Sequence, residues 1–327
     1  MPQVQTVNGP VDSSELGPTL MHEHVFVLTP DLLHNYPDYP AAWDEERRVT
    51  DAIDKLGRLA ELGIRSIVDP TVVGLGRYIP RIQRINKELD LNIIVATGLY
   101  TYNDIPPTFH YVGPGTPIGG DDPMVEMFVK DITEGIAGTG VKAAFLKCAI
   151  DEPGLTIGVE RVLRAVAKAH RATGAPITVH TSVANQSGLI AQRVLTEEGV
   201  DLSRVVMGHS GDSTDLEYLR KLADAGSFLG MDRFGVDVYL PTSDRVATVA
   251  ALARDGYADR MVLAHDASCY IDWFDPELIK AVSPNWHYEH ISNDVLPALR
   301  DAGVTEEQIT MMMETNPRRY FENVKPY

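Results

Sequence analysis

The sequence is poor in cysteine and has no long apolar run. Its 327 residues include two cysteines, Cys148 and Cys269, and both lie inside short apolar segments. Two such cysteines offer neither a disulfide framework nor a zinc-finger spacing, so we expect a reducing compartment. No window approaches the roughly 18 apolar residues of a membrane span, and no basic stretch followed by an apolar one suggests a signal peptide. These absences predict a cytoplasmic protein.

Basic residues are also few. The chain has 29 lysines and arginines against 46 aspartates and glutamates, which gives a formal charge of -17. This excess of negative charge repels the phosphates of nucleic acids and of anionic membranes, so we expect neither as a partner. Low-complexity tracts that could separate domains are missing as well. We therefore predict one domain over residues 1–327.

Strand-length apolar runs recur along the chain, and amphipathic segments of helix length separate them. Eight such β and α units in this length predict a single (β/α)8 TIM barrel, with an open doubly wound sheet as the alternative. The expected strands are residues 19–25, 66–71, 92–98, 143–150, 176–182, 205–211, 228–235 and 261–267. The expected helices are residues 46–62, 79–89, 123–137, 158–173, 189–198, 215–225 and 244–255. Long loops, which are usually functional, are expected at residues 30–44 and 102–122.

Histidines stand at the carboxyl ends of several expected strands, the end at which barrel enzymes place their active sites. His22 and His24 end the first strand, and alternation along a strand turns both to one face and Glu23 to the other. A histidine pair of this kind is weak evidence for a metal site, because many histidines are ordinary core or surface residues.

Further candidate ligands end other strands: His180 the fifth, His209 the sixth, and His265 with Asp266 the eighth. Only one of His265 and Asp266 can face the barrel interior, and we assign Asp266 inward because a carboxylate is harder to bury in the outer layer. Separate caps or core residues remain the alternative. The repetition on different strands favours a metal site at the carboxyl ends of the barrel strands.

Lys147 lies in the middle of an otherwise apolar expected strand and shares a face with Phe145. Burying an unpaired ammonium is costly, so this lysine must be neutralised, paired or reactive. One possibility is a Schiff-base lysine, as barrel aldolases use. The other is reaction with carbon dioxide, which would turn the amine into a carboxylate able to bridge two cations. The nearby histidines and aspartate favour the bridge.

These residues resemble the pattern of the phosphotriesterase-like lactonases of the amidohydrolase superfamily, and the resemblance covers essentially the whole chain. The runs Leu-Met-His-Glu-His at 20–24, Ala-Thr-Gly-Leu-Tyr at 96–100, Met-Asp-Arg-Phe-Gly at 231–235 and Asn-Trp-His at 285–287 resemble that family too. The resemblance implies a homodimeric hydrolase with two divalent metal ions per chain, zinc first and cobalt, iron or manganese as alternatives. It also implies opening of N-acyl homoserine lactones, hence quorum quenching, with a side activity on phosphotriesters.

The resemblance also implies roles for individual residues. His22, His24 and Asp266 would hold the more buried metal, His180 and His209 the more exposed one, and N6-carboxylated Lys147 would bridge them. Asp266 would pass a proton to the leaving alkoxide, Tyr100 would reach the metal centre, and Arg233 would order the site. Tyr100 could instead be loop packing, and Arg233 a partner of Asp232.

Substrate specificity is expected from the loops. Ser268, Trp273 and Trp286 are the candidate substrate-binding residues beyond Tyr100 and Arg233, and Ser268 stands where many relatives carry cysteine. Phe274 next to Trp273, and Tyr102, Phe109 and Tyr111 after the third strand, would add to an aromatic channel for an acyl chain. The same aromatics could equally hold long loops down or form a dimer contact. The short segment between residues 235 and 244 resembles the lactonases and favours a lactone.

Four other functions are compatible with parts of this pattern, and one of them is a barrel without catalysis that binds a metal or a ligand structurally. A native phosphotriesterase or another esterase of the superfamily would share the two metals. A mononuclear deaminase of the superfamily would have no need of Lys147. A Schiff-base aldolase would need Lys147 but not the cluster of histidines.

Overall fold

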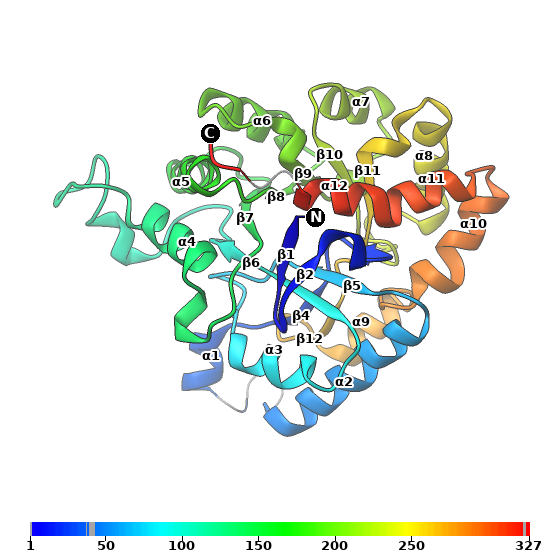
Figure 1. Cartoon of the computed structure of the whole chain (residues 1–327), viewed down its shortest axis with the longest axis horizontal. Coiled ribbons are helices and arrows are strands. Elements are labelled where there is room, and N and C mark those ends of the chain that lie inside the picture. Colours follow the sequence, from blue (N-terminus) through cyan, green and yellow to red (C-terminus); the bar gives the residue numbers. More distant parts are fainter. Residues whose placement is uncertain (1, 37, 39–42, 323–324) are drawn as a thin grey trace.

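Eight parallel strands form the centre of the protein, shown as a computed structural model that describes residues 2–36, 38, 43–322 and 325–327 (Figure 1). They are ordered β11-β10-β9-β8-β7-β6-β5-β3. The sheet is brought to closure where Met21 N, just past β3, donates to Leu263 O of β11 at 3.1 Å. The predicted TIM barrel is confirmed, and the open doubly wound alternative is wrong. The strands are β3 Thr19–Leu20, β5 Ser66–Asp69, β6 Asn92–Gly98, β7 Phe145–Ile150, β8 Ile177–Thr181, β9 Val205–Gly208, β10 Phe228–Met231 and β11 Met261–Leu263.

The helices lie around the outside of this sheet (Figure 1). Local sequence determines their ends: Asp44 caps α2 by accepting from Arg47 N, and Thr156 caps α5, which ends at Gly174 in the left-handed conformation. Their limits lie close to the expected ones. The helices that follow barrel strands are α2 Glu45–Glu61, α3 Ile79–Asn86, α4 Pro123–Thr133, α5 Ile157–Thr173, α6 Ser187–Glu197, α7 Leu216–Asp224 and α8 Thr242–Arg254.

Several strands are shorter than expected because the chain turns away just before or at the candidate site. His209, Arg233 and Asp266 have φ angles of 63°, 64° and 55°, in the left-handed region that non-glycine residues rarely adopt. The first expected strand is likewise interrupted: after β3 the chain resumes as β4 His24–Val27, which pairs in parallel with β12 Ser268–Ile271. Backbone strain of this kind gathers at functional sites.

The opposite, amino end of the barrel is covered by elements outside the eight βα units. A hairpin of β1 Gln3–Thr6 and β2 Gly9–Asp12 lies there, since Val7 N donates to Ile93 O at the start of β6. The last helix, α12 Asn316–Glu322, also reaches this end, where the Tyr320 hydroxyl lies 2.9 Å from Thr178 Oγ1. Preceding helices are α10 Leu296–Asp301 and α11 Glu306–Thr310, joined by π-helical turns at Ile291–Val295 and Met311–Thr315.

The two expected loops contain little regular structure. The first begins with α1 Pro30–Asn35, and its residues 37 and 39–42 lie outside the described residues. The second has one short helical turn, η2 Pro107–His110. After β12, a short exposed helix, α9 Pro276–Val282, lies in the loop that follows the eighth strand. Within the described ranges, no helix is long and apolar enough to cross a membrane.

Candidate metal centre

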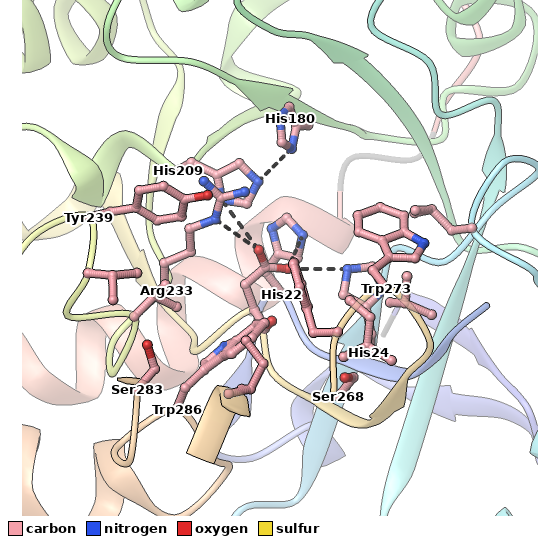
Figure 2. Close-up of a pocket in the computed structure, with 18 of the residues that line it drawn as sticks. His22, His24, His180, His209, Arg233, Tyr239, Ser268, Trp273, Ser283 and Trp286 are labelled. Atoms are coloured by element: carbon pink, nitrogen blue, oxygen red, sulfur yellow. Dashed lines mark hydrogen bonds and ion pairs between the residues drawn. The ribbon is translucent and has the colours of Figure 1, made fainter. Parts of the chain in front are cut away.

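A cavity of about 240 Å³ opens at the carboxyl ends of the barrel strands. Its floor is polar and buried, and its walls come from the loops after the strands (Figure 2). The structure brings every candidate site residue to this one cavity. The predicted residues that line it are His22, His24, Tyr100, Lys147, His180, His209, Arg233, Asp266, Ser268, Trp273 and Trp286.

One group of ligand atoms gathers around Asp266. Its Oδ1 lies 3.3 Å from His22 Nε2 and 3.2 Å from His24 Nε2. His22, His24 and Asp266 each offer one atom within 4.8 Å of the others, so they can hold a metal ion. The outer nitrogens of both rings are occupied: His22 Nδ1 lies 3.1 Å from Asp232 Oδ2, and His24 Nδ1 lies 2.7 Å from Thr71 Oγ1.

A second group is formed by His180 and His209, whose Nδ1 and Nε2 atoms lie 2.8 Å apart. His209 Nδ1 contacts Asp232 Oδ1 at 2.8 Å, and His180 Nε2 contacts Asp151 Oδ2 at 2.6 Å. The hydrogen bond from His180 lowers the pKa of Asp151 to about 2. Both carboxylates therefore accept an N–H from the outer side of a ring.

This arrangement fixes the tautomers in a way that suits cations. When the outer nitrogens donate to Asp232, Asp151 and Thr71, the inner nitrogens of the four histidines carry lone pairs. Those lone pairs then face one another and the Asp266 carboxylate, which is repulsive unless positive charge lies between them. Burial lowers the pKa of His22 to about 4 and that of His209 well below its usual value. Both rings therefore stay neutral near neutral pH and do not supply the positive charge themselves. Imidazole nitrogens with a carboxylate oxygen are the ligands of zinc and related divalent ions.

Lys147 lies on the interior face of β7, as predicted, and is 1% exposed. Phe145 on the same face belongs to the core inside the barrel, whereas Leu146 and Cys148 pack in the outer core. The Lys147 Nζ atom lies 3.4 Å from His22 Nε2. Burial lowers the pKa of Lys147 to about 8, so a neutral amine is accessible near neutral pH.

Arg233 is not only a partner of Asp232, the predicted alternative, because it contacts the site itself. Its Nε donates to Asp266 Oδ2 at 3.0 Å and its Nη1 donates to Asp212 Oδ2 at 3.0 Å. The fully buried Arg245 in turn donates to Asp212 Oδ1 at 2.6 Å. Positive and negative side chains therefore alternate from Arg245 through Asp212 and Arg233 to Oδ2 of Asp266.

The assignment of Asp266 inward and His265 outward agrees with this geometry. His265 is fully buried in the outer layer, where its Nδ1 lies 2.7 Å from Glu23 Oε1. Glu23 also accepts from the backbone N–H groups of His265 and Ala267 at 2.8 and 3.0 Å. The Glu23 carboxyl therefore holds the turn that aims Asp266 into the barrel.

The aromatic residues expected to form a channel divide into two sets. Trp273, Phe274 and Trp286 line the cavity, together with Val236, Val238, Tyr239 and Ile271. Of the aromatics after the third barrel strand, only Tyr100 lines it; the Tyr100 ring lies 5.3 Å from that of His180. Phe109 is buried in the hydrophobic core, and Tyr102 and Tyr111 are 45% and 59% exposed outside the cavity, so a lining role for these three is wrong.

Sequence reasoning missed the carboxylates that orient the histidines. Asp232 contacts both His22 and His209, and Asp151 contacts His180. The sequence could have indicated both, because each directly follows an apolar strand. Asp151 follows Ile150 of β7, and Asp232 follows Met231 of β10. For Asp212 there was no such indication, since its importance depends on contacts with distant arginines.

Comparison with known proteins assigns this constellation to a family: the phosphotriesterase family matches residues 2–321. The chain belongs to the phosphotriesterase family. It is 59% identical over 328 residues to a phosphotriesterase homology protein of Mycobacterium tuberculosis, with 100% of both chains covered. It is 39% identical over 313 residues to an aryldialkylphosphatase of Saccharolobus solfataricus, covering 95% of this chain and 96% of that one.

A solved structure extends this similarity to three dimensions. The phosphotriesterase from M. tuberculosis superposes with a TM-score of 0.98 at 58% identity, with 100% of both chains covered. The resemblance seen in the sequence is therefore confirmed. As a member of the phosphotriesterase family, the chain is a phosphotriesterase-like hydrolase whose histidine and aspartate groups can hold metal.

Proposed function

We propose that this chain is a binuclear metal-dependent lactonase that opens N-acyl homoserine lactones and hydrolyses phosphotriesters as a side activity. The observation that supports it is a cavity in which a floor of converging ligand atoms meets walls of apolar side chains. Such a cavity matches a substrate with a polar ring at one end and an acyl chain at the other. In this proposal the lactonase serves quorum quenching in the cytoplasm.

Two divalent ions, zinc first among the candidates, fit the available ligand atoms. His22, His24 and Asp266 would hold one and His180 and His209 the other, with Lys147 between them. Bound there, the ions would lower the pKa of a water molecule towards about 7 and polarise the substrate carbonyl.

Lys147 would bridge the ions after carboxylation of its side chain. The neutral Nζ forms a bond to the carbon of CO₂, one C–O π pair moves onto oxygen, and the amine loses one proton to water. The product is an N-carboxylate with two ligand oxygens. The lowered pKa of Lys147 supports this reaction, because only the unprotonated amine can attack.

Three residues of the chain would act on the substrate. Asp266 would take a proton from the attacking water and return it to the leaving alkoxide, which in a lactone stays attached to the product. Arg233 would orient Asp266 through its 3.0 Å hydrogen bond to Oδ2. Burial raises the pKa of Tyr100, so its phenol stays protonated and can donate a hydrogen bond to the substrate.

The apolar walls would bind the acyl chain. Trp273, Phe274 and Trp286 come from the loop after the eighth strand, and Ser268 lies at its start. Trp286 is also structural, because its Nε1 donates to His265 O at 3.0 Å. This arrangement supports a role for the loop in both substrate binding and support of the site.

We propose a homodimer formed by the loops after β5 and β6. Each of these loops carries exposed apolar side chains: Tyr78 is 53%, Tyr111 59% and Ile118 72% exposed. Size-exclusion chromatography with light scattering tests this, and a monomer at micromolar concentration would contradict it. The variant Ile118→Asp should shift a dimer towards monomer.

The second candidate is a native phosphotriesterase, which the relative named aryldialkylphosphatase favours. Turnover of N-acyl homoserine lactones and of paraoxon by the zinc-loaded protein separates the two. We expect the larger kcat/KM for a lactone; a larger value for paraoxon would overturn the lactonase proposal. Metal analysis should give two ions per chain, whereas one ion would favour a deaminase-like site. Borohydride trapping of a carbonyl compound on Lys147 would favour an aldolase.

A further inference from the structure

A second cavity, of about 420 Å³, lies beside the candidate metal centre. Its walls come from α2, from β12 and from the loop that contains α9. Ile279, Ser283 and Trp286 line both this cavity and the first one, so the two adjoin. None of the proposed metal ligands lines the second cavity, and the proposed hydrolysis gives no role to its cations.

The charge of the second cavity is opposite to that of the chain. Arg48, Lys55 and Lys280 contribute three cations to its lining, and Glu277 contributes the one carboxylate. The chain as a whole has a formal charge of -17. A local group of cations in such a chain would concentrate an anion there that the rest of the surface repels.

The two innermost cations have donors to spare among the described residues. The Arg48 guanidinium lies 3.6 Å above the centre of the Tyr270 ring, and its buried Nε has no hydrogen-bond partner. The nearest carboxylate contact of Arg48, from Nη1 to Asp51 Oδ2, is long at 3.9 Å. Lys55 Nζ donates to Cys269 O at 2.7 Å, which leaves two of its three N–H bonds for a ligand.

The remaining walls are apolar. Ile271, Phe274, Ile279, Pro284 and Trp286 extend from the cations towards the first cavity. A small inorganic anion would leave these side chains uncovered, and a neutral lipid would leave the arginine and the lysine unpaired. An anionic head with an apolar tail satisfies both parts of the cavity.

We propose that the second cavity is a binding site for a fatty carboxylate. The carboxylate accepts hydrogen bonds from Arg48 and Lys55, and the alkyl chain lies along Phe274 and Ile279 towards Trp286. The two cations of this site lie outside the metal centre, whereas Phe274 and Trp286 also line the first cavity.

The test is isothermal titration of the metal-loaded protein with decanoate below its micellar concentration. We expect Arg48→Gln and Lys55→Gln each to weaken binding at least about ten-fold, because each removes a charge-assisted hydrogen bond. Arg58→Gln is the matched control, since Arg58 lies on the same helix, is 53% exposed, pairs with Glu289 and does not line the cavity. Its affinity for decanoate should stay within about two-fold.

A second ligand distinguishes the contribution of the carboxylate to binding from that of the alkyl chain. Decanol has the same chain without the charge and should bind at least about ten-fold more weakly than decanoate. Equal affinity of decanoate for the wild type and for Arg48→Gln and Lys55→Gln would overturn the proposal, because the carboxylate would then be bound elsewhere, as at the metal centre. If Arg48→Gln melts at a lower temperature than the wild type, Lys55→Gln carries the test, because Lys55 supplies the other hydrogen bond to the carboxylate.

Discussion

Lys147 combines deep burial with a pKa of about 8, a combination that favours reaction over a permanent charge. We expect Lys147→Ala to lose at least about 100-fold in kcat, because the link between the two proposed ions is removed. Short carboxylic acids such as acetate or propionate, supplied with zinc, should restore part of this activity, since a free carboxylate can take the vacated place. Steady-state kinetics over a range of acid concentration measures the rescue.

The matched control for that experiment is Lys168→Ala. Lys168 is exposed on α5 and should show neither the loss nor the rescue. A Lys147→Ala protein that keeps two ions and still gains nothing from carboxylic acids would argue against the bridge.

Asp232 is the residue on which both halves of the site depend, since its two oxygens contact His22 Nδ1 and His209 Nδ1. In Asp232→Asn one of those oxygens becomes an N–H donor that faces a ring N–H, so one histidine must change its tautomer. We expect metal affinity to fall about 10- to 100-fold. Competition with a chromogenic chelator measures it, and the surface variant Asp224→Asn should behave like the wild type. Unchanged metal affinity would show that Asp232 does not set the tautomers.

Trp273 lines the cavity and is 44% exposed, so it can contact substrate without supporting the core. Each methylene that it helps to bury contributes up to about 0.8 kcal/mol. We expect Trp273→Ala to lower kcat/KM for a long-chain N-acyl homoserine lactone about ten-fold and that for paraoxon less than about three-fold. Ile157→Ala is the control, because Ile157 is 91% exposed at the start of α5 and does not line the cavity. Equal losses on the two substrates would remove the proposed acyl-binding role.

At the scale of single elements, the short strands matter because the residues at or just beyond their ends carry the site. β6 and β7 approach closely at Gly98, which has a φ of 143°, and a Cβ built there would lie 1.9 Å from the carbonyl oxygen of Lys147. Only glycine permits this approach. The backbone of Lys147 is thus positioned by a neighbouring strand that has no side chain at that point.

Gly98→Ala should therefore push β7 away and move Lys147. We expect a loss of more than about 2 kcal/mol in the free energy of unfolding, together with a fall in activity. Urea unfolding followed by circular dichroism measures the loss. Gly57→Ala is the contrasting variant, because Gly57 is inside α2 with its nearest neighbour at 3.9 Å, and alanine should stabilise that helix by about 0.5–1 kcal/mol. A stable and fully active Gly98→Ala protein would contradict the close approach.

At the scale of the whole molecule, the proposed ligands join segments that are far apart in the chain. His22 and His24 come from the start of the barrel, Lys147 and His180 from its middle, and Asp266 from the turn after its last strand. These residues come together only in the folded state, so the ions would bind the folded chain and not the unfolded one. Their binding free energy is then added to the free energy of folding.

Removal of the ions should lower activity and thermal stability together. We expect chelation to lower the melting temperature by at least about 5 °C, since an ion at 100 times its dissociation constant contributes about 2.7 kcal/mol. Differential scanning calorimetry before and after dialysis against a chelator measures this change, and added zinc should reverse it. The same melting temperature with and without chelator would show that these residues do not form a metal site.

The amino-acid sequence determined the barrel and the residues at its carboxyl end. Apolar periodicity and the alternation of side chains along a strand are local properties, and they suffice to locate the strands and to turn Lys147 and Asp266 inward. The repetition of histidine at the same point of several βα units then brings the ligands to one end, because parallel strands share that end. The extent of the strands was less predictable, since left-handed residues such as His209 end them early.

Only the tertiary structure decided which polar groups orient the ligands and which loop side chains face the substrate. Asp232 contacts a histidine 210 residues away, and Trp286, but not Tyr111, lines the cavity. Arg48 and Lys280, far apart in sequence, line the second cavity together. No local pattern marks such pairs, because the free energy of a hydrogen bond or an ion pair depends on a separation of a few ångströms. That separation exists only after distant segments have packed against one another.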